Sequence, residues 1–250
     1  MKSMNIIRDK LYRFIPSHVS RRVVLACYDF GIVFGAAKRQ AEVNHENNLA
    51  ALTKRFGERR DVFIENQAEL TDIALAKRYT YAYGGCGAIA LHNMKLSLKE
   101  MMGAPDTAAL FREMEVTGCA YRGKAGFSPK ALVRYLKRHR YLYAVYTGAR
   151  SDKIDRMASA RSNEDAKAFL FQTFLVTGYN DGRTIGERIH TVNIERTREG
   201  FVIHNGYRYD AAAKQYTASR PYRTLSDAVH HIDAAGYSAA LMVVGVRGNV

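Results

Sequence analysis

The chain has 250 residues, 47% of them hydrophobic and 25% charged, a composition that supports one sizeable core and argues against intrinsic disorder. The formal net charge of +14 favours acidic partners, yet no Lys/Arg run exceeds two residues and no tract resembles a nucleic-acid-binding motif. Three cysteines, at positions 27, 86 and 119, do not make a disulfide framework, which predicts a reducing, cytoplasmic location. The most apolar early stretch, residues 23–37, is too short to span a bilayer.

Residues 1–77 are predicted to form a helical, basic N-terminal region. The first 60 residues hold 12 Lys and Arg against 5 Asp and Glu. Apolar residues recur at helical spacing in residues 6–15 and 49–56, and Gly57 is expected to close the second of these helices. The apolar run at residues 62–64 fits either a strand or a helical turn. The apolar residues at 23–34 are expected to pack against the rest of the chain.

The basic pairs of this region are expected to stay in solvent. They are Arg21-Arg22, Lys38-Arg39 and Arg59-Arg60. Two interpretations remain open for them: they bind an anionic partner, or they only keep the protein soluble.

Residues 78–250 are predicted to form a second region, in which helices come first. An irregular, Gly-rich segment at 79–87 leads into a buried helix at 88–96. A second helix is expected from Asp106, as its cap, and a third from Ser128-Pro129, a cap followed by proline in the first turn.

The later part of this region has the pattern of strands. Segments rich in β-branched and aromatic residues lie between turn signals, at 141–146, 169–177, 189–195, 201–204 and 239–246. One late helix is predicted from Thr224 to residue 235, opened by a Thr224-x-x-Asp227 capping box and closed at Gly236. Helices followed by antiparallel strands indicate an α+β fold.

Cys86 is the strongest candidate for a reactive group. It lies between glycines, where an irregular segment becomes a helix, and glycines let the backbone turn and a substrate approach closely. A thiol at a helix N-terminus is favoured as the reactive thiolate, so we expect a depressed pKa for Cys86. The alternative is a buried, inert cysteine.

His190 and Asn205 strengthen the functional interpretation. His190 opens one predicted strand and Asn205 ends the next, so a hairpin turning at Glu199-Gly200 brings the two together. Asn205 is then expected to accept the ring N–H of His190 and fix its tautomer, while the other ring nitrogen faces Cys86.

The segment from Tyr83 to Asn93 resembles the nucleophile helix of papain-like cysteine peptidases, and is most similar to the bacterial branch that includes bacteriocin-leader peptidases. Gly126-Phe127-Ser128-Pro129 is similar to the step before that branch's third helix, and residues 190–194 and 201–206 resemble its His and Asp/Asn strands. The resemblance covers about residues 79–246. It implies a papain-like fold in which Cys86, His190 and Asn205 form a catalytic triad.

One departure from that family concerns the oxyanion hole. Family members carry a Gln or similar amide five or six residues before the cysteine, whereas this chain has Thr80 and Tyr81 there. Either hydroxyl is a candidate donor, together with the backbone N–H of Cys86. Loss of one such donor lowers the rate by about 10²–10³-fold.

The sequence therefore predicts a thiol enzyme that cleaves or transfers an acyl group from a peptide or other amide, with no cofactor and no metal site. The alternative is a non-catalytic module of the same fold that holds an acidic partner. His92 and Asn93 are expected to pack or cap, and His230 and His231 to face solvent.

Overall fold

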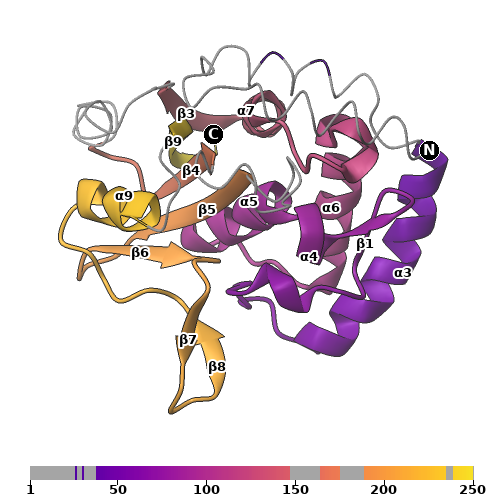
Figure 1. The fold of residues 1–250 in the computed structure, drawn as a ribbon, viewed down its shortest axis with the longest axis horizontal. Coiled ribbons are helices and arrows are strands. Elements are labelled where there is room, and N and C mark those ends of the chain that lie inside the picture. Colours follow the sequence, from indigo (N-terminus) through magenta and orange to yellow (C-terminus); the bar gives the residue numbers. More distant parts are fainter. Residues whose placement is uncertain are drawn as a thin grey trace, which may run out of the picture.

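The structure, a computed structural model, describes residues 26, 30, 38–146, 164–174, 189–234 and 239–249. In this part of the chain, helices from the first half pack against an antiparallel sheet from the second half, which confirms the α+β class (Figure 1). None of the helices described combines the length and the apolar character needed to cross a lipid bilayer.

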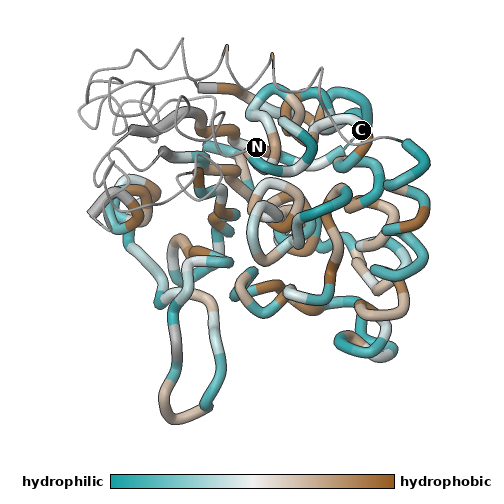
Figure 2. Tube along the Cα trace, turned by 45° about the vertical axis from the view of Figure 1, so that its right-hand side comes forward, coloured by the Kyte–Doolittle hydropathy of each residue, from teal (hydrophilic) through white to brown (hydrophobic). Residues whose placement is uncertain are grey.

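The described chain starts with α3 (Lys38–Phe56), which packs against α6 (Ala104–Gly118). The predicted helix end at Gly57 is confirmed, because Gly57 has a φ of 60° and donates its N–H to the carbonyl oxygen of Thr53 at 2.9 Å. In Figure 2, hydrophilic residues follow the outer turns of α3, while apolar residues gather along the interior helices and strands.

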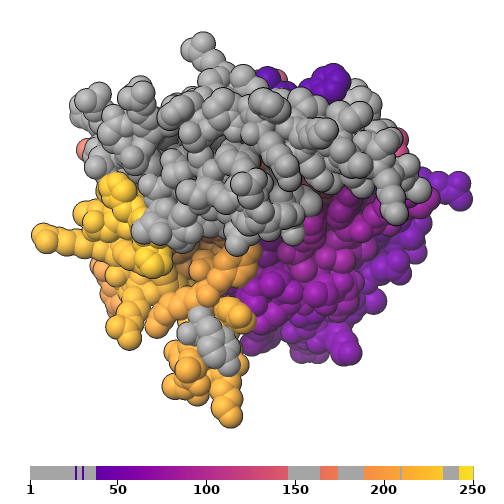
Figure 3. Space-filling view, in the orientation of Figure 1, coloured from indigo at the N-terminus to yellow at the C-terminus, as the bar shows by residue number. Residues whose placement is uncertain are grey.

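The main sheet has five strands in the order β3-β9-β4-β5-β6, and each neighbouring pair is antiparallel. The strands are β3 (Tyr141–Tyr146), β4 (Ala168–Phe174), β5 (Ile189–Arg196), β6 (Phe201–His204) and β9 (Ala239–Asn249). All five occur where the sequence predicts strands. A small hairpin, β7 (Arg208–Asp210) and β8 (Gln215–Thr217), stands away from the body of the molecule (Figure 3).

Each face of the sheet is covered by a different helix. On one face, Leu170 and Val244 belong to a core cluster that includes Ile89 of α5 (Cys86–Ser97). On the other face, Phe171 and Val192 pack in a second cluster with residues of α9 (Leu225–Ala234). Because strand side chains alternate between faces, successive residues of β5 contact different helices.

The predicted division of the chain at residue 77 does not separate two cores. Leu52 and Leu75 lie in the same hydrophobic cluster as Ile89. The two-stranded ladder of β1 (Ala74–Leu75) and β2 (Tyr79–Thr80) spans residue 77. Residues 38–77 thus share the main core, because helix α3 buries Leu52 and Phe56 there, in line with the expectation that the N-terminal region packs against the rest of the chain.

Most of the predicted packing of residues 23–34 lies outside the described residues, as do residues 6–15 and the pair Arg21-Arg22. Phe30 is described and is 60% exposed, against the expectation that it is buried. The pairs Lys38-Arg39 and Arg59-Arg60 are exposed as predicted, and Arg60 forms an ion pair with Asp106 at 3.2 Å.

Helix starts agree with the sequence prediction in two cases and differ in one. Ser128 caps α7 (Pro129–Arg138) by accepting the N–H of Lys130, and Thr224 and Asp227 exchange the two bonds of a capping box before α9. The predicted cap Asp106 instead lies inside α6, where its carboxylate accepts the N–H of Gly103 at 3.0 Å. The preceding Gly103 occupies the cap position, because proline in the first turn moves the start of the helix upstream.

Candidate functional site

Cys86 is the first residue of α5, and the glycines around it are required by packing. A Cβ atom on Gly85 would lie 2.5 Å from the carbonyl oxygen of Tyr81, and one on Gly87 would lie 2.9 Å from the Cβ of Phe127. Gly85 has an ordinary helical backbone, with φ −80° and ψ −9°. The expectation that these glycines make room for a substrate is therefore corrected: they let α5 approach the short helix α4 (Tyr81–Gly84) and Phe127.

The Cys86 thiol is buried between α5 and β5. Its side chain is 3% exposed, and its sulfur lies 3.9 Å from the carbonyl oxygen of Ile189. Burial raises the pKa of the thiol, while hydrogen bonds from the hydroxyl and N–H of Thr191 and from the N–H groups of Gly87 and Cys86 act in the opposite direction. The prediction of a depressed pKa is wrong, since desolvation outweighs the N-terminal N–H groups.

Alkylation of Cys86 is expected to be slower at pH 7 than that of an unfolded-chain cysteine, because less of the buried thiol is ionised. The rate should continue to rise above the ordinary thiol pKa, about 8.5. Iodoacetamide labelling read by peptide mass spectrometry measures this, with the urea-unfolded protein as control. A plateau below pH 8 in the folded protein would contradict the buried-thiol geometry.

His190 is held as a neutral base. Its Nε2 lies 2.9 Å from the backbone carbonyl oxygen of Asn205, and because a carbonyl only accepts, Nε2 carries the proton. Burial lowers the pKa of His190 to about 4, although the bond to Asn205 acts to raise it. The ring is therefore neutral at pH 7, and its unprotonated nitrogen is Nδ1.

The expected neighbourhood of His190 and Asn205 is found, but the contact differs from the predicted one. The Asn205 side chain is paired with Gln67: its Oδ1 accepts the N–H of Gln67 at 3.0 Å, and its Nδ2 donates to Oε1 of Gln67 at 3.1 Å. The backbone carbonyl of Asn205, not its side chain, orients His190. Asn205 has a φ of 60°, a left-handed conformation that turns its carbonyl away from the strand ladder toward the ring.

Cys86 and His190 lie on different faces of β5. The sulfur contacts Thr191, whose side chain faces α5, whereas the next side chain back, His190, lines a cavity on the α9 face. The predicted Cys86–His190 hydrogen bond is not among the contacts of the described residues. The physical reason is the alternation of a strand, which places neighbouring side chains on opposite sides of the sheet.

Thr191 is the residue that sequence reasoning missed at the thiol. Its hydroxyl bonds to the sulfur of Cys86 and also accepts the side-chain N–H of Gln172 at 3.0 Å. Strand alternation was the available signal, because Thr191 and His190 are neighbours in β5 and must lie on opposite faces of the sheet, so both cannot face α5.

The two candidates for the oxyanion hole have different outcomes. Tyr81 is fully buried, stacks on Phe111 with ring centroids 3.9 Å apart, and donates its hydroxyl to the carbonyl oxygen of Phe111 at 2.9 Å. Tyr81 is therefore wrong as an oxyanion donor, since its hydroxyl is bonded within the core. Thr80 is half-buried before α4 and makes no capping bond with its side chain, so its role stays a prediction.

The structural role predicted for His92 and Asn93 is confirmed. The side chain of Asn93 makes two hydrogen bonds with the backbone of Ile64. Its Oδ1 accepts the N–H and its Nδ2 donates to the carbonyl oxygen, each at 2.9 Å, as a neighbouring strand would. His92 bonds through Nε2 to the carbonyl oxygen of Val62 at 2.9 Å. The apolar run at 62–64 is thus neither strand nor helix, and α5 side chains hold it in place.

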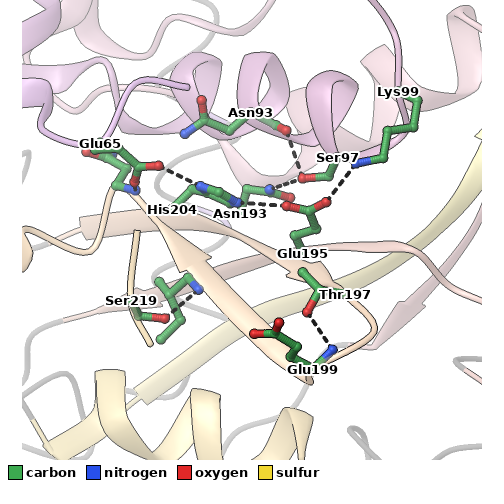
Figure 4. Close-up of polar contacts among 12 residues, drawn as sticks. Glu65, Asn93, Ser97, Lys99, Asn193, Glu195, Thr197, Glu199, His204 and Ser219 are labelled. Carbon is green, nitrogen blue, oxygen red and sulfur yellow. Dashed lines mark hydrogen bonds and ion pairs between the residues drawn. The ribbon is translucent and has the colours of Figure 1, made fainter. Parts of the chain in front are cut away.

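A chain of charged side chains runs from the buried His204 to the exposed Lys99 (Figure 4). His204 contacts Glu65 through Nδ1 at 2.7 Å and Glu195 through Nε2 at 3.1 Å, and Lys99 bonds to the same Glu195 at 3.2 Å. Glu65 also accepts the N–H of Asn205 at 3.1 Å. The chain therefore anchors the residue whose carbonyl orients His190. No short sequence pattern indicates this chain of charges, because its residues meet only in the folded protein.

Within the described ranges, no three His, Cys, Asp or Glu side chains lie close enough together to hold a metal ion. The exposed positions of His230 and His231 agree with the prediction, although His231 also borders the cavity next to His190. Comparison of the chain with protein-family models, with curated proteins and with solved structures found no match.

Proposed function

We propose that the protein is a papain-like cysteine enzyme that transfers acyl groups from amides or esters, with Cys86 as nucleophile and His190 as general base. The observation that carries the proposal is the bond from Nε2 of His190 to the carbonyl of Asn205, which places the ring proton on Nε2 and makes Nδ1 the basic nitrogen. The cysteine that begins α5 lies beside the backbone preceding this histidine, because its sulfur is 3.9 Å from the carbonyl of Ile189.

The protonation states of Cys86 and His190 determine how the proposed reaction starts. Since burial raises the pKa of Cys86 and lowers that of His190, both are neutral at pH 7. The thiol proton therefore passes to Nδ1 as the sulfur attacks the carbonyl carbon. The new S–C bond forms, the bond to the leaving amine or alcohol breaks, and the proton goes from His190 to that leaving group. Water or an amine then attacks the thioester and loses a proton to Nδ1, the C–S bond breaks, and His190 returns that proton to the sulfur.

This reaction requires a rearrangement of the described geometry. The thiol has to leave Thr191 and the carbonyl of Ile189, and the imidazole has to turn from its cavity toward the N-terminus of α5. The described state is accordingly a resting state, and substrate binding supplies the free energy for the change.

The alternative function is a non-catalytic binding module. It is favoured by the burial of Cys86 and by the placement of His190 on the opposite face of β5. In such a module both residues stabilise the fold and the thiol is inert. Covalent acylation distinguishes the two functions.

The test is formation of an acyl-enzyme from an activated ester such as p-nitrophenyl acetate, read by intact and peptide mass spectrometry. Acylation is expected at Cys86, and His190→Gln should slow it by about 10²–10⁴-fold, the usual contribution of a general base. Cys119, which is also buried, serves as the internal control, and His231→Gln is the control for a second histidine beside the same cavity. Equal acylation of Cys86 and Cys119, or no effect of His190→Gln, would support the binding module instead.

A further inference from the structure

The sheet face opposite Cys86 carries a cavity of about 410 Å³, lined by residues of β5, β6, α9 and the chain segments on either side of the β7–β8 hairpin turn. We propose that this cavity binds a small molecule with an apolar chain and one anionic group, a carboxylate or a phosphate monoester. The proposal goes beyond the acyl-transfer function, because binding requires no chemistry at Cys86.

The floor of the cavity is apolar. Val192 and Ile203 of the sheet and Ile232 of α9 line it, and all three are buried members of the second core cluster. The ring of Tyr222 forms part of the wall. An alkyl chain placed here would exchange water for aliphatic and aromatic surface, which is the usual character of small-molecule sites.

The rim carries positive charge. Arg208 and Arg220 both line the cavity, and no Asp or Glu does so among the described residues. Arg208 donates to the carbonyl oxygen of Ala218 at 3.0 Å, which leaves further guanidinium N–H groups for an anion. The N–H groups of Ala213 and Ala212 in the hairpin turn are the main cause that lowers the pKa of Asp210, and the charges of the two arginines add to it.

The backbone at the rim is held in a costly conformation. Tyr207 has a φ of 57°, which is uncommon for a bulky residue, and its side chain is 40% exposed. The conformation places its ring 5.0 Å from that of His190, in a stacked arrangement at the mouth of the cavity. Left-handed backbone at non-glycine residues is concentrated at ligand-contacting loops.

The volume of the cavity limits the size of the ligand. A cavity of about 410 Å³ holds roughly a dozen water-sized groups, at about 30 Å³ each. Octanoate, with an eight-carbon chain and one carboxylate, is of this size and has the required chemistry. Its carboxylate would lie at Arg208 and Arg220, and its chain would extend over Val192 toward His190.

Isothermal titration of the full chain with octanoate tests the proposal. One molecule is expected to bind, and hexanoate should bind about 15-fold more weakly, at about fourfold for each methylene. Octanol, which lacks the charge, should bind at least tenfold more weakly than octanoate. Octyl phosphate, measured alongside, shows whether the carboxylate or the phosphate is preferred; tighter binding of either supports the site.

Variants locate the site. The double variant Arg208→Gln/Arg220→Gln is expected to weaken octanoate binding at least tenfold. The single variant Arg220→Gln, at an exposed position, should weaken it at least threefold. The single variant keeps the test valid if the double variant folds poorly. Arg134→Gln/Arg198→Gln removes two exposed arginines elsewhere and should leave the affinity within twofold. Cys86→Ala should also leave it unchanged, which separates this site from the thiol chemistry. Absence of binding at millimolar octanoate, equal binding of octanol, or equal binding by Arg220→Gln would overturn the proposal.

Discussion

Replacing His204 with alanine is expected to lower the free energy of unfolding by about 3–5 kcal/mol at pH 7, because it removes a buried charged ring that bridges two largely buried carboxylates. Both ring nitrogens of His204 face carboxylates, Glu65 at 2.7 Å and Glu195 at 3.1 Å. The ring also stacks on Phe63, with centroids 3.9 Å apart. Urea denaturation of the purified variant measures the loss.

The pH dependence of this loss follows from the charge on the ring. Burial alone would lower the pKa of His204, but the hydrogen bonds and charges of Glu195 and Glu65 raise it above its ordinary value. The stabilisation is therefore fully present below the unfolded-state pKa, about 6.5, and is lost as the pH rises through the folded-state pKa. The His204→Ala penalty should be larger at pH 6 than at pH 9.

His139→Ala is the matched control. His139 also contacts a carboxylate, Glu113 at 2.9 Å, and packs on an aromatic ring, Tyr135, but its side chain is 38% exposed. Exposed pairs contribute less than about 1 kcal/mol. A loss for His204→Ala as small as that for His139→Ala would contradict a charged, buried cluster.

The second large effect is expected at Glu115, whose replacement by glutamine should flatten the pH dependence of stability. Glu115 is 1% exposed, and its Oε1 accepts bonds from Asn44 at 2.7 Å and from the N–H of Ala76 at 3.0 Å. Burial raises the pKa of this carboxyl to about 7, although those two bonds act to lower it. The contacts join α3, α6 and the residue that follows β1.

The direction in which stability changes with pH follows from the raised pKa of Glu115. Folding favours the protonated form of Glu115, so its stabilising contribution is present below the unfolded pKa of 4.5 and is lost as the pH rises toward 7. The loss is about 3 kcal/mol, at 1.36 kcal/mol for each pH unit between the two values. The wild type should therefore lose about 3 kcal/mol more than Glu115→Gln between pH 4.5 and pH 8.

Comparing the two proteins at each pH cancels the titration of His92 and His190, which is common to both. Glu58→Gln is the control. Glu58 is exposed just after the end of α3, so its substitution removes one negative charge, as Glu115→Gln does, without changing a buried group. A profile for Glu115→Gln parallel to that of the wild type would mean that the carboxyl ionises without penalty in the folded protein.

The sequence predicted the local structure well because local signals determine it. Strands 141–146 and 201–204 coincide with β3 and β6, since both segments are rich in β-branched and aromatic residues and lie between turn signals. The end of α3 at Gly57 and the start of α7 at Ser128 follow from capping chemistry, which acts within a few residues.

The candidate site was predicted only in part because it depends on contacts far apart in the chain. The hairpin brought Asn205 to His190, but the register pairs Asn193 with His204, so that the Asn205 side chain faces Gln67. The other two differences from the predicted site come from burial. Burial raises the pKa of Cys86 against the effect of the helix N-terminus, and Tyr81 lies in the core, not at the site. Neither burial nor register can be obtained from short motifs.

The tight packing of Gly85 and Gly87 around Cys86 has a consequence for sequence motifs that include these glycines. A side chain at Gly85 would collide with Tyr81, and one at Gly87 with Phe127, whether or not position 86 carries out chemistry. A Gly-Gly-Cys-Gly signature at the start of this helix therefore records a steric demand of the architecture. A chain of the same architecture with another residue at position 86 would be under the same demand at both glycines, so a search keyed to the glycines selects for the architecture and carries no information about chemistry at position 86.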